Sequence, residues 1–261
     1  MKAVTLTVSR ESFDHGGTRN LAATHASGDI LLFMTQDALP SNEFFIENLI
    51  KPLKDEKVAA AYGRQMPIPE TQLLERISKE FNYPSVSYHK SKEDLGRYGI
   101  KTFFFTNVCS AVKTPVFYKV GRFPEPIIMS EDMILAAKCI LADYKVAYAA
   151  DAQVEHSHNY TLGQTFKRYF DIGGAIGMNR WILDYTSAEG QGGRLLRAQI
   201  HQLIRPKNWR WIPLWVGESV VKYAGYRLGL LCHALPRRMC RGMSMHPGFW
   251  DQSENTNTIM R

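Results

Sequence analysis

Apolar and polar positions along the first half of the chain alternate in patterns that predict short strands separated by helices. Residues 3–8 alternate as in a half-exposed strand, and residues 30–34 form a continuous apolar run that suits a buried strand. Further strands are expected at residues 58–62, 103–112 and 145–149, and helices at about residues 19–27, 42–53 and 131–142. Strands that alternate with helices at this spacing predict an α/β fold with a mostly parallel sheet.

Local signals refine the ends of these elements. Thr18 can cap the first helix and Gly28 can end it, while Ser130 can cap the helix that opens with Glu131. Residues 84–101 are polar and irregular, which is typical of a surface excursion or a mobile lid.

The pattern changes at Thr161, after which helical spacing dominates. Thr161 and Gln164 form a capping box that predicts a helix through about Trp181. A flexible break is expected at the glycines that follow, which are Gly190, Gly192 and Gly193. We therefore expect two parts, an α/β domain over residues 1–160 and a helical, basic region over residues 161–261.

A long helix is expected to begin near Pro213. One apolar stripe runs along it at intervals of three or four residues, formed by Leu214, Gly217, Val221, Ala224, Leu228, Leu231 and Leu235. Glu218 and Lys222 lie on a different face as a favourable i,i+4 pair. The stripe suits an amphipathic helix at a membrane interface, and it equally suits a helix packed on the catalytic domain or on a second subunit.

The positive charge of the chain is concentrated at its C-terminal end. Residues 160–261 carry 14 Lys and Arg against 6 Asp and Glu, whereas residues 1–159 carry 18 against 19. A basic end indicates an anionic partner, although it is also compatible with a solvated face. Apart from charge and three tryptophans, no motif indicates a nucleic acid, so a membrane surface is the expected partner.

Composition excludes several other classes of protein. With 45% hydrophobic and 22% charged residues, the chain has the composition of an ordinary globular protein. The four cysteines show no CxxC spacing, which argues against a zinc knuckle or a disulfide framework and favours a reducing compartment. Neither a secretory leader nor a spanning helix is expected, because the most apolar late stretch, residues 211–235, carries Glu218, Lys222 and Arg227.

Three polar clusters follow predicted strands or open a helix. They are Gln36-Asp37, Glu131-Asp132 and Glu155-His156-Ser157-His158. In α/β sheets, ligand-binding groups lie beyond the carboxyl ends of strands. A carboxylate and an imidazole that meet there can hold Mg²⁺ or Mn²⁺, and a second carboxylate can act as a general base. Each cluster also has an ordinary explanation as a turn, a helix start or a hydrogen-bonded loop.

Longer motifs surround these clusters. They read FDHGGTRN over residues 13–20, GDILLFMTQDALP over residues 28–40, SEDM over residues 130–133, HSHNY over residues 156–160 and LPRR over residues 235–238. With these motifs the chain resembles, over nearly its whole length, the inverting family-2 glycosyltransferases of the bacterial rhamnosyltransferase type. The resemblance implies a partial catalytic domain over residues 1–160 with the Rossmann-like GT-A fold, the fold of nucleotide-diphospho-sugar transferases. It also implies that the C-terminal amphipathic helices of residues 161–261 associate with a membrane or with the acceptor.

The resemblance also implies a role for individual residues. Asp132 matches the family's catalytic base, which takes the proton from the acceptor hydroxyl as that oxygen attacks the anomeric carbon. Asp37 matches the second carboxylate of a metal-binding DxD motif, but Thr35 stands at the first position, so we expect a weaker dependence on Mg²⁺ or Mn²⁺. His156 or His158 would be the late histidine near the metal, and the choice between them stays open.

The resemblance also implies which residues contact the sugar donor, and they lie in two predicted helices. Arg19 and Asn20 begin a helix beside the expected donor site, where a guanidinium and a helix N-terminus suit phosphate. Arg168, which follows Gln164, is a candidate contact to phosphate or acceptor. The implied donor is a nucleotide sugar, dTDP-rhamnose, and the implied acceptor is a lipid-linked or growing cell-surface polysaccharide. The implied location is peripheral, on the inner face of the cytoplasmic membrane.

One departure from the family concerns the N-terminus. Related chains begin with a further strand, turn and helix of roughly 50 residues that carry the nucleobase site, a size consistent with one crossover unit. This chain starts at the later strand, so we expect the nucleobase-binding segment to be absent and sugar-nucleotide binding to be weak. The alternative function is that of a catalytically impaired fragment acting as a membrane-associated binding or partner subunit.

Overall fold

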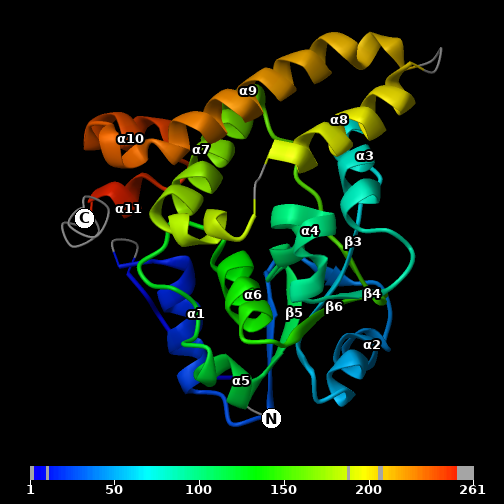
Figure 1. The fold of residues 1–261 in the computed structure, drawn as a ribbon, viewed down its shortest axis with the longest axis vertical. Coiled ribbons are helices and arrows are strands. Elements are labelled where there is room, and N and C mark those ends of the chain that lie inside the picture. Colours follow the sequence, from blue (N-terminus) through cyan, green and yellow to red (C-terminus); the bar gives the residue numbers. More distant parts are fainter. Residues whose placement is uncertain (1–2, 10–11, 187–188, 205–207, 252–261) are drawn as a thin grey trace.

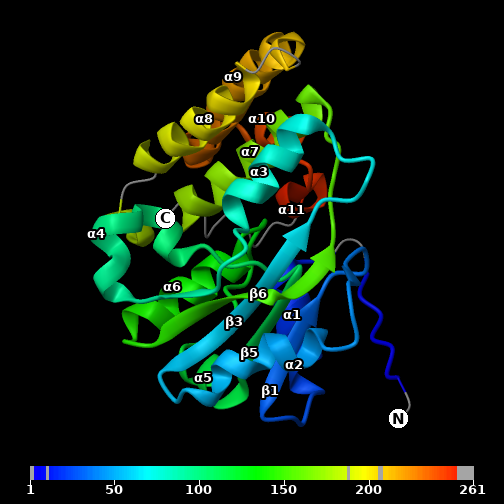
Figure 2. The ribbon, with the colours of Figure 1, turned by 90° about the vertical axis from the view of Figure 1, so that its right-hand side faces the viewer.

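A mixed sheet forms the centre of the fold, as seen in a computed structural model that describes residues 3–9, 12–186, 189–204 and 208–251 (Figures 1 and 2). Within these residues the strand order is β1-β5-β3-β6-β2, and β4 also pairs with β6. The strands are β1 (Ile30–Met34), β2 (Leu39–Pro40), β3 (Val58–Met66), β4 (Tyr88–Lys90), β5 (Cys109–Lys113) and β6 (Lys145–Glu155). The predicted α/β class is confirmed.

The expectation of a mostly parallel sheet is wrong. Among the described strands only β3 and β6 pair in parallel, and the other pairings are antiparallel. The reason is that β5 lies in reverse between β1 and β3, which themselves run in the same direction as β6. A continuous apolar run carries no information about the direction of a strand, so it could not distinguish the two kinds of pairing.

The first predicted strand is also wrong. Residues 3–9 have no regular secondary structure, and the side chains of Val4 and Leu6 are 75% and 38% exposed. No described strand pairs with this segment, and an extended segment without ladder hydrogen bonds has little to hold it. The strand predicted for residues 30–34, by contrast, has the bounds of β1, but it is buried on one face alone, because Leu32 and Met34 are exposed.

Two hydrophobic cores lie on the two faces of the sheet. In β5, Ala111 packs in one core and Val112 in the other, as the two-residue period of a strand requires. One core is covered by α2 (Phe45–Ile50), and the other by α5 (Thr114–Lys119) and α6 (Glu131–Leu141).

The helix α1 (His15–Thr24) starts four residues earlier than a cap at Thr18 would place it. Asp14 is the N-cap instead, and its carboxylate accepts the backbone N–H of Gly17. Gly16 lies so close to the loop before α6 that a Cβ there would stand 2.0 Å from the Pro124 carbonyl oxygen. The glycines of the HGGTRN motif therefore let this helix approach the loop closely.

The region expected to be irregular contains several short elements. Residues 84–101 include β4, a 3-10 helix at Lys92–Asp94, α4 (Leu95–Tyr98) and the start of a 3-10 helix at Gly99–Phe103. The strand predicted for residues 103–112 is confined to β5, because Phe103 packs into the core from the end of that 3-10 helix and Phe105 packs there from the loop that follows. The helix α3 (Leu73–Asn82) was not predicted.

Every described element after β6 is helical. The helices are α7 (Leu162–Met178), α8 (Glu189–Leu203), α9 (Ile212–Leu230), α10 (Arg237–Met243) and α11 (Pro247–Asp251), with 3-10 helices at Arg180–Asp184, Trp209–Trp211 and Cys232–Ala234. The capping box of Thr161 and Gln164 is confirmed at the start of α7. The predicted flexible break is wrong, because Gly190, Gly192 and Gly193 lie within α8.

These helices gather at one end of the sheet, where α8 and α9 run in opposite directions and meet at a tip that points away from it (Figures 1 and 2). The helix α9 crosses α7 at glycines on both partners. A Cβ on Gly229 would lie 2.1 Å from the Phe170 carbonyl oxygen, and one on Gly173 would lie 2.2 Å from that of Tyr226. One face of the predicted amphipathic helix is thus packed on the rest of the chain. Within the described residues, the structure contains no helix of sufficient length and apolarity to span a membrane.

Candidate active site

A cavity of about 480 Å³ lies between the sheet and the C-terminal helices. Its walls come from the loops that follow β1, β3 and β6, from α3, from the start of α6, and from the inward sides of α7 and α9. Thr35, Asp132, His156 and His158 are among the residues that line it. Two of the three polar clusters predicted from the sequence, at Glu131-Asp132 and after β6, therefore line one cavity.

Asp37 lies against two of these lining residues. The short strand β2 pairs with the end of β6, which brings the loop after β1 beside the loop after β6. One carboxylate oxygen of Asp37 stands 3.5 Å from Nε2 of His156 and 3.4 Å from Nε2 of His158. Both histidines that the sequence left as alternatives reach the same oxygen, so the geometry brings both of them to Asp37.

The ionisation of this cluster suits a cation. Partial burial acts to raise the pKa of Asp37, but the Thr35 hydroxyl and the two imidazoles outweigh it and lower the pKa overall. Burial lowers the pKa of His156 to about 4 and also lowers that of His158. At neutral pH the cluster is one carboxylate with two neutral imidazoles.

This cluster can hold a divalent metal. Its three ligand atoms, one oxygen and two nitrogens, all lie within 4.8 Å of one another. Neutral imidazole and carboxylate are ligands that Mn²⁺ and other first-row metals accept, whereas Mg²⁺ prefers oxygen alone. The residues present therefore fit a metal of this kind.

Asp132 lies in the first turn of α6 and lines the same cavity. One of its oxygens accepts the backbone N–H of Asn107 at 3.1 Å, and the other accepts the N–H of Met133 at 2.7 Å. Burial and the neighbouring Glu131 raise the pKa of Asp132 to about 7 in spite of these bonds. A carboxyl with a pKa near neutrality suits general base catalysis.

Glu131 has a different environment. Its side chain is buried, forms an ion pair with Arg19 at 3.0 Å and accepts the side-chain amide of Asn107 at 3.0 Å. Through these contacts Glu131 ties α1 to the start of α6. It thereby holds Arg19 at the wall of the cavity.

Of the other residues predicted to contact the sugar donor, one lines the cavity and one is buried in the core. Arg168 lines the cavity from α7, with its guanidinium 5.5 Å from the centre of the Tyr160 ring. Asn20 does not line it, since this buried side chain spans the backbone N–H and carbonyl of Phe123 at 3.1 and 3.0 Å. The structure thus brings Arg19 and Arg168 to the cavity and leaves Asn20 holding the loop before α6.

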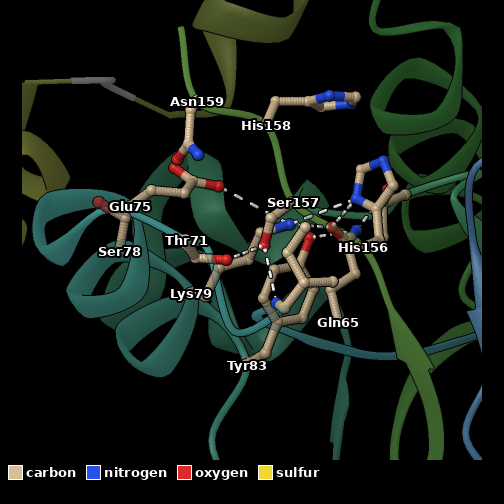
Figure 3. Close-up of polar contacts among 12 residues, drawn as sticks. Gln65, Thr71, Glu75, Ser78, Lys79, Tyr83, His156, Ser157, His158 and Asn159 are labelled. Atoms are coloured by element: carbon tan, nitrogen blue, oxygen red, sulfur yellow. Dashed lines mark hydrogen bonds and ion pairs between the residues drawn. The ribbon is translucent and has the colours of Figure 1, made fainter.

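Sequence reasoning missed two buried residues that support the cluster. Gln65 lies near the carboxyl end of β3, and Lys79 lies on α3 (Figure 3). Both make polar contacts with His156. The position of Gln65 at a strand end was a usable signal, whereas nothing in the pattern of α3 marks Lys79.

Comparison with known proteins identifies the family. Residues 2–121 match the family model described as glycosyl transferase family 2. The chain is 40% identical over 253 residues to the O-antigen chain rhamnosyltransferase RfbN of Salmonella typhimurium, covering 96% of this chain and 80% of RfbN. It is 39% identical over 255 residues to the O-antigen chain rhamnosyltransferase WbaN of Salmonella anatum, covering 97% and 81%.

The chain belongs to glycosyl transferase family 2. The resemblance stated from its motifs is confirmed, and the chemistry of this family-2 glycosyltransferase is glycosyl transfer. The range matched by the family model includes Arg19, Asp37 and Gln65, whereas Asp132 and the two histidines lie beyond it.

Likeness to solved structures is weaker. A mannosyltransferase from Pyrobaculum calidifontis, PcManGT, solved in complex with GDP-Man and Mn²⁺, is 17% identical with a TM-score of 0.46. The alignment covers 94% of this family-2 glycosyltransferase and 63% of that chain.

Proposed function

We propose that this family-2 glycosyltransferase transfers a rhamnosyl residue from dTDP-rhamnose, with inversion, to a lipid-linked or growing O-antigen acceptor. The observation that carries the proposal is that a carboxylate suited to base catalysis, Asp132, shares one cavity with two arginines and with the two histidines that contact Asp37. The identity of 40% to a protein named as an O-antigen chain rhamnosyltransferase supports the choice of sugar and acceptor.

In the proposed reaction the acceptor hydroxyl gives its proton to Asp132 as its oxygen bonds to the anomeric carbon. The bond between that carbon and the diphosphate breaks, and dTDP leaves with the electron pair. Each carboxylate oxygen already accepts one backbone N–H, and each retains a lone pair for the acceptor hydroxyl. The two backbone donors thus fix the base without blocking it.

The leaving diphosphate requires positive charge. Arg19 and Arg168 face the cavity and can supply it, with Arg19 held in place by its ion pair to Glu131. A metal held by Asp37, His156 and His158 would supply further positive charge to the diphosphate when bound. The oxygen-poor donor set gives Mn²⁺ preference over Mg²⁺ as the cofactor.

A lipid-linked acceptor requires the enzyme to work at a membrane, and we place it peripherally on the inner face of the cytoplasmic membrane. The outward side of α9 supports this, because Val216, Val220 and Tyr223 are 47%, 60% and 64% exposed. Trp209, which is 69% exposed, precedes this helix and is followed by Arg210. Exposed apolar and aromatic side chains beside basic ones suit an anionic lipid surface.

The test supplies the purified protein with a lipid-linked O-antigen oligosaccharide, Mn²⁺ and one of dTDP-rhamnose, GDP-mannose or UDP-glucose. Mass spectrometry should show addition of one deoxyhexosyl residue from dTDP-rhamnose alone, and NMR should show an inverted anomeric centre. Transfer of a different sugar, or retention of configuration, contradicts the proposal.

Asp132→Asn is the matching variant, because it keeps the shape and removes the basic oxygen. We expect transfer to fall by about 10²-fold or more, with donor affinity, measured by calorimetry, changed less than threefold. Unchanged turnover would exclude Asp132 as the base. Asp143→Asn, a change at an exposed carboxylate after α6, serves as the control.

A further inference from the structure

Gln65 lies between Lys79 and His156, and its amide contacts both (Figure 3). All three side chains are buried, with 4%, 7% and 7% of their surface exposed. Because buried polar groups need partners, the donors and acceptors of this network can be assigned one after another.

The assignment begins at Lys79. Its ammonium donates to Gln65 Oε1 and forms an ion pair with Glu75 at 3.8 Å. An ammonium has donors only, so the Gln65 amide must turn its oxygen towards it. The amide nitrogen then donates to the hydroxyls of Tyr83 at 2.7 Å and Thr106 at 3.2 Å, both of which can accept.

The next step concerns the ring of His156. Its Nδ1 stands 2.9 Å from the same Gln65 oxygen and 3.4 Å from the Lys79 ammonium. The oxygen can only accept and is clearly the nearer of the two, so we assign the hydrogen to Nδ1. In a neutral imidazole the other nitrogen, Nε2, then has a bare lone pair. This lone pair lies 3.5 Å from a carboxylate oxygen of Asp37, with no hydrogen between the two acceptors.

Two acceptors that face each other in this way are stabilised by a cation between them. We propose that Gln65, oriented by Lys79, is a positioning residue that fixes His156 as the Nδ1–H tautomer and thereby presents Nε2 to a divalent metal held with Asp37 and His158. The inference rests on the metal site of the proposed function. In this arrangement Gln65 on β3 and Lys79 on α3 support His156, the metal ligand that follows β6.

The first readout is the tautomer of His156 in the metal-free protein. Long-range ¹H–¹⁵N spectra at one neutral pH distinguish a protonated ring nitrogen from a bare one, and His156→Gln identifies the signal. Wild type and Gln65→Glu, which keeps an acceptor, should show Nδ1–H and bare Nε2. Gln65→Leu should show a mixture of tautomers. An unchanged tautomer in Gln65→Leu overturns the inference.

The second readout is Mn²⁺ affinity, measured from the EPR signal of the free ion. Gln65→Leu should weaken binding by about 10- to 100-fold, as loss of an outer partner of a metal-bound histidine does. Gln65→Glu should stay within threefold of wild type. Gln199→Leu removes an equally buried amide, 3% exposed, on α8 and should change neither readout.

Lys79→Met provides a second variant should Gln65→Leu fail to fold. It keeps the glutamine and removes the ammonium that orients it, so the tautomer should again become mixed. A wild-type protein that binds no Mn²⁺ refutes the metal site, and the tautomer comparison then still decides the role of Gln65. Wild-type Mn²⁺ affinity in both Gln65→Leu and Lys79→Met refutes the positioning role.

Discussion

Asp132 can act as a base only as a carboxylate, and its surroundings oppose ionisation. Burial and the negative charge of Glu131 raise its pKa to about 7. Below that pH the group is protonated and inactive, so kcat/KM should rise by roughly tenfold per pH unit and level off above about pH 7. The rate of transfer at low substrate concentration, measured from pH 5 to 9, checks this.

Glu131→Gln tests the cause of that shift. Removing a negative neighbour makes the Asp132 carboxylate easier to form, so its pKa falls and the midpoint of the profile moves to lower pH. Glu218→Gln is the control, because Glu218 lines the same cavity but pairs with Lys222 on α9 at 2.8 Å. A profile that stays in place in Glu131→Gln, or that moves equally in both variants, would show that Glu131 does not set this pKa.

The choice of metal is also decided by single residues. With Thr35 where a carboxylate would give a further oxygen ligand, the cluster offers two nitrogens and one carboxylate. We expect Mn²⁺ to restore activity after chelation at a concentration about tenfold or more below that required of Mg²⁺. Thr35→Asp adds a carboxylate oxygen ligand, so the Mn²⁺ and Mg²⁺ concentrations that restore activity should become more alike. Equal titrations with the two metals would contradict the assignment of nitrogen ligands.

The candidate site was largely predictable at this scale, for a physical reason. Asp37, His156 and His158 follow strands, and the ends of strands that share a sheet lie close together, so chain order indicated their meeting. Lys79 lies on a helix whose place over the cavity depends on tertiary packing. The prediction that Asn20 contacts the donor is not supported, because its side chain bonds to the backbone of Phe123 instead. An asparagine suits either role, so the residue type alone could not decide between them.

At the scale of elements, glycines in α9 divide into those the fold requires and those it tolerates. A Cβ on Gly229 would stand 2.1 Å from the Phe170 carbonyl oxygen, whereas one on Gly217 would make an ordinary 3.6 Å contact with Leu162. Gly229→Ala should therefore push the helices apart and cost about 1–3 kcal/mol. Gly217→Ala should raise the free energy of unfolding by about 0.5–1 kcal/mol, because alanine favours a helix more than glycine does.

Urea unfolding of the two variants beside wild type measures both free energies. Gly217→Ala is a matched control because it makes the same substitution in the same helix. Equal effects of the two substitutions would mean that the close crossing of α7 and α9 does not exist in solution.

Elements with strong local signals were predictable, and those set by partners were not. The capping box at Thr161 and the apolar run of β1 need no distant residue to be recognised, and both are confirmed. Residues 3–8 have the composition of a strand but no paired neighbour among the described residues. The direction of β5 and the helix over Gly190 depend on tertiary contacts that outweigh local propensity.

At the scale of the whole molecule, α9 has two apolar sides, and the described residues cover only one of them. Its inward side packs on α7 through Gly225 and Gly229, while Val220 and Tyr223 face outward. Apolar side chains that gather on an exposed face normally mark a contact with a partner or a membrane. The concentration of basic residues towards this end of the chain favours an anionic lipid surface as the cover.

Val220→Glu should therefore weaken binding to vesicles that contain phosphatidylglycerol. Losing the burial of one valine costs about 1.5 kcal/mol or more, which corresponds to roughly tenfold in partition. Val86→Glu makes the same change at a side chain that is 72% exposed before β4, away from the helical end, and should leave flotation unaltered. Wild-type binding should also fall as NaCl is raised, because the basic side chains contribute through screened charge. Equal flotation of both variants would show that α9 does not contact the membrane. If light scattering finds a wild-type dimer that Val220→Glu dissociates, the outward face of α9 instead binds a second copy of the chain.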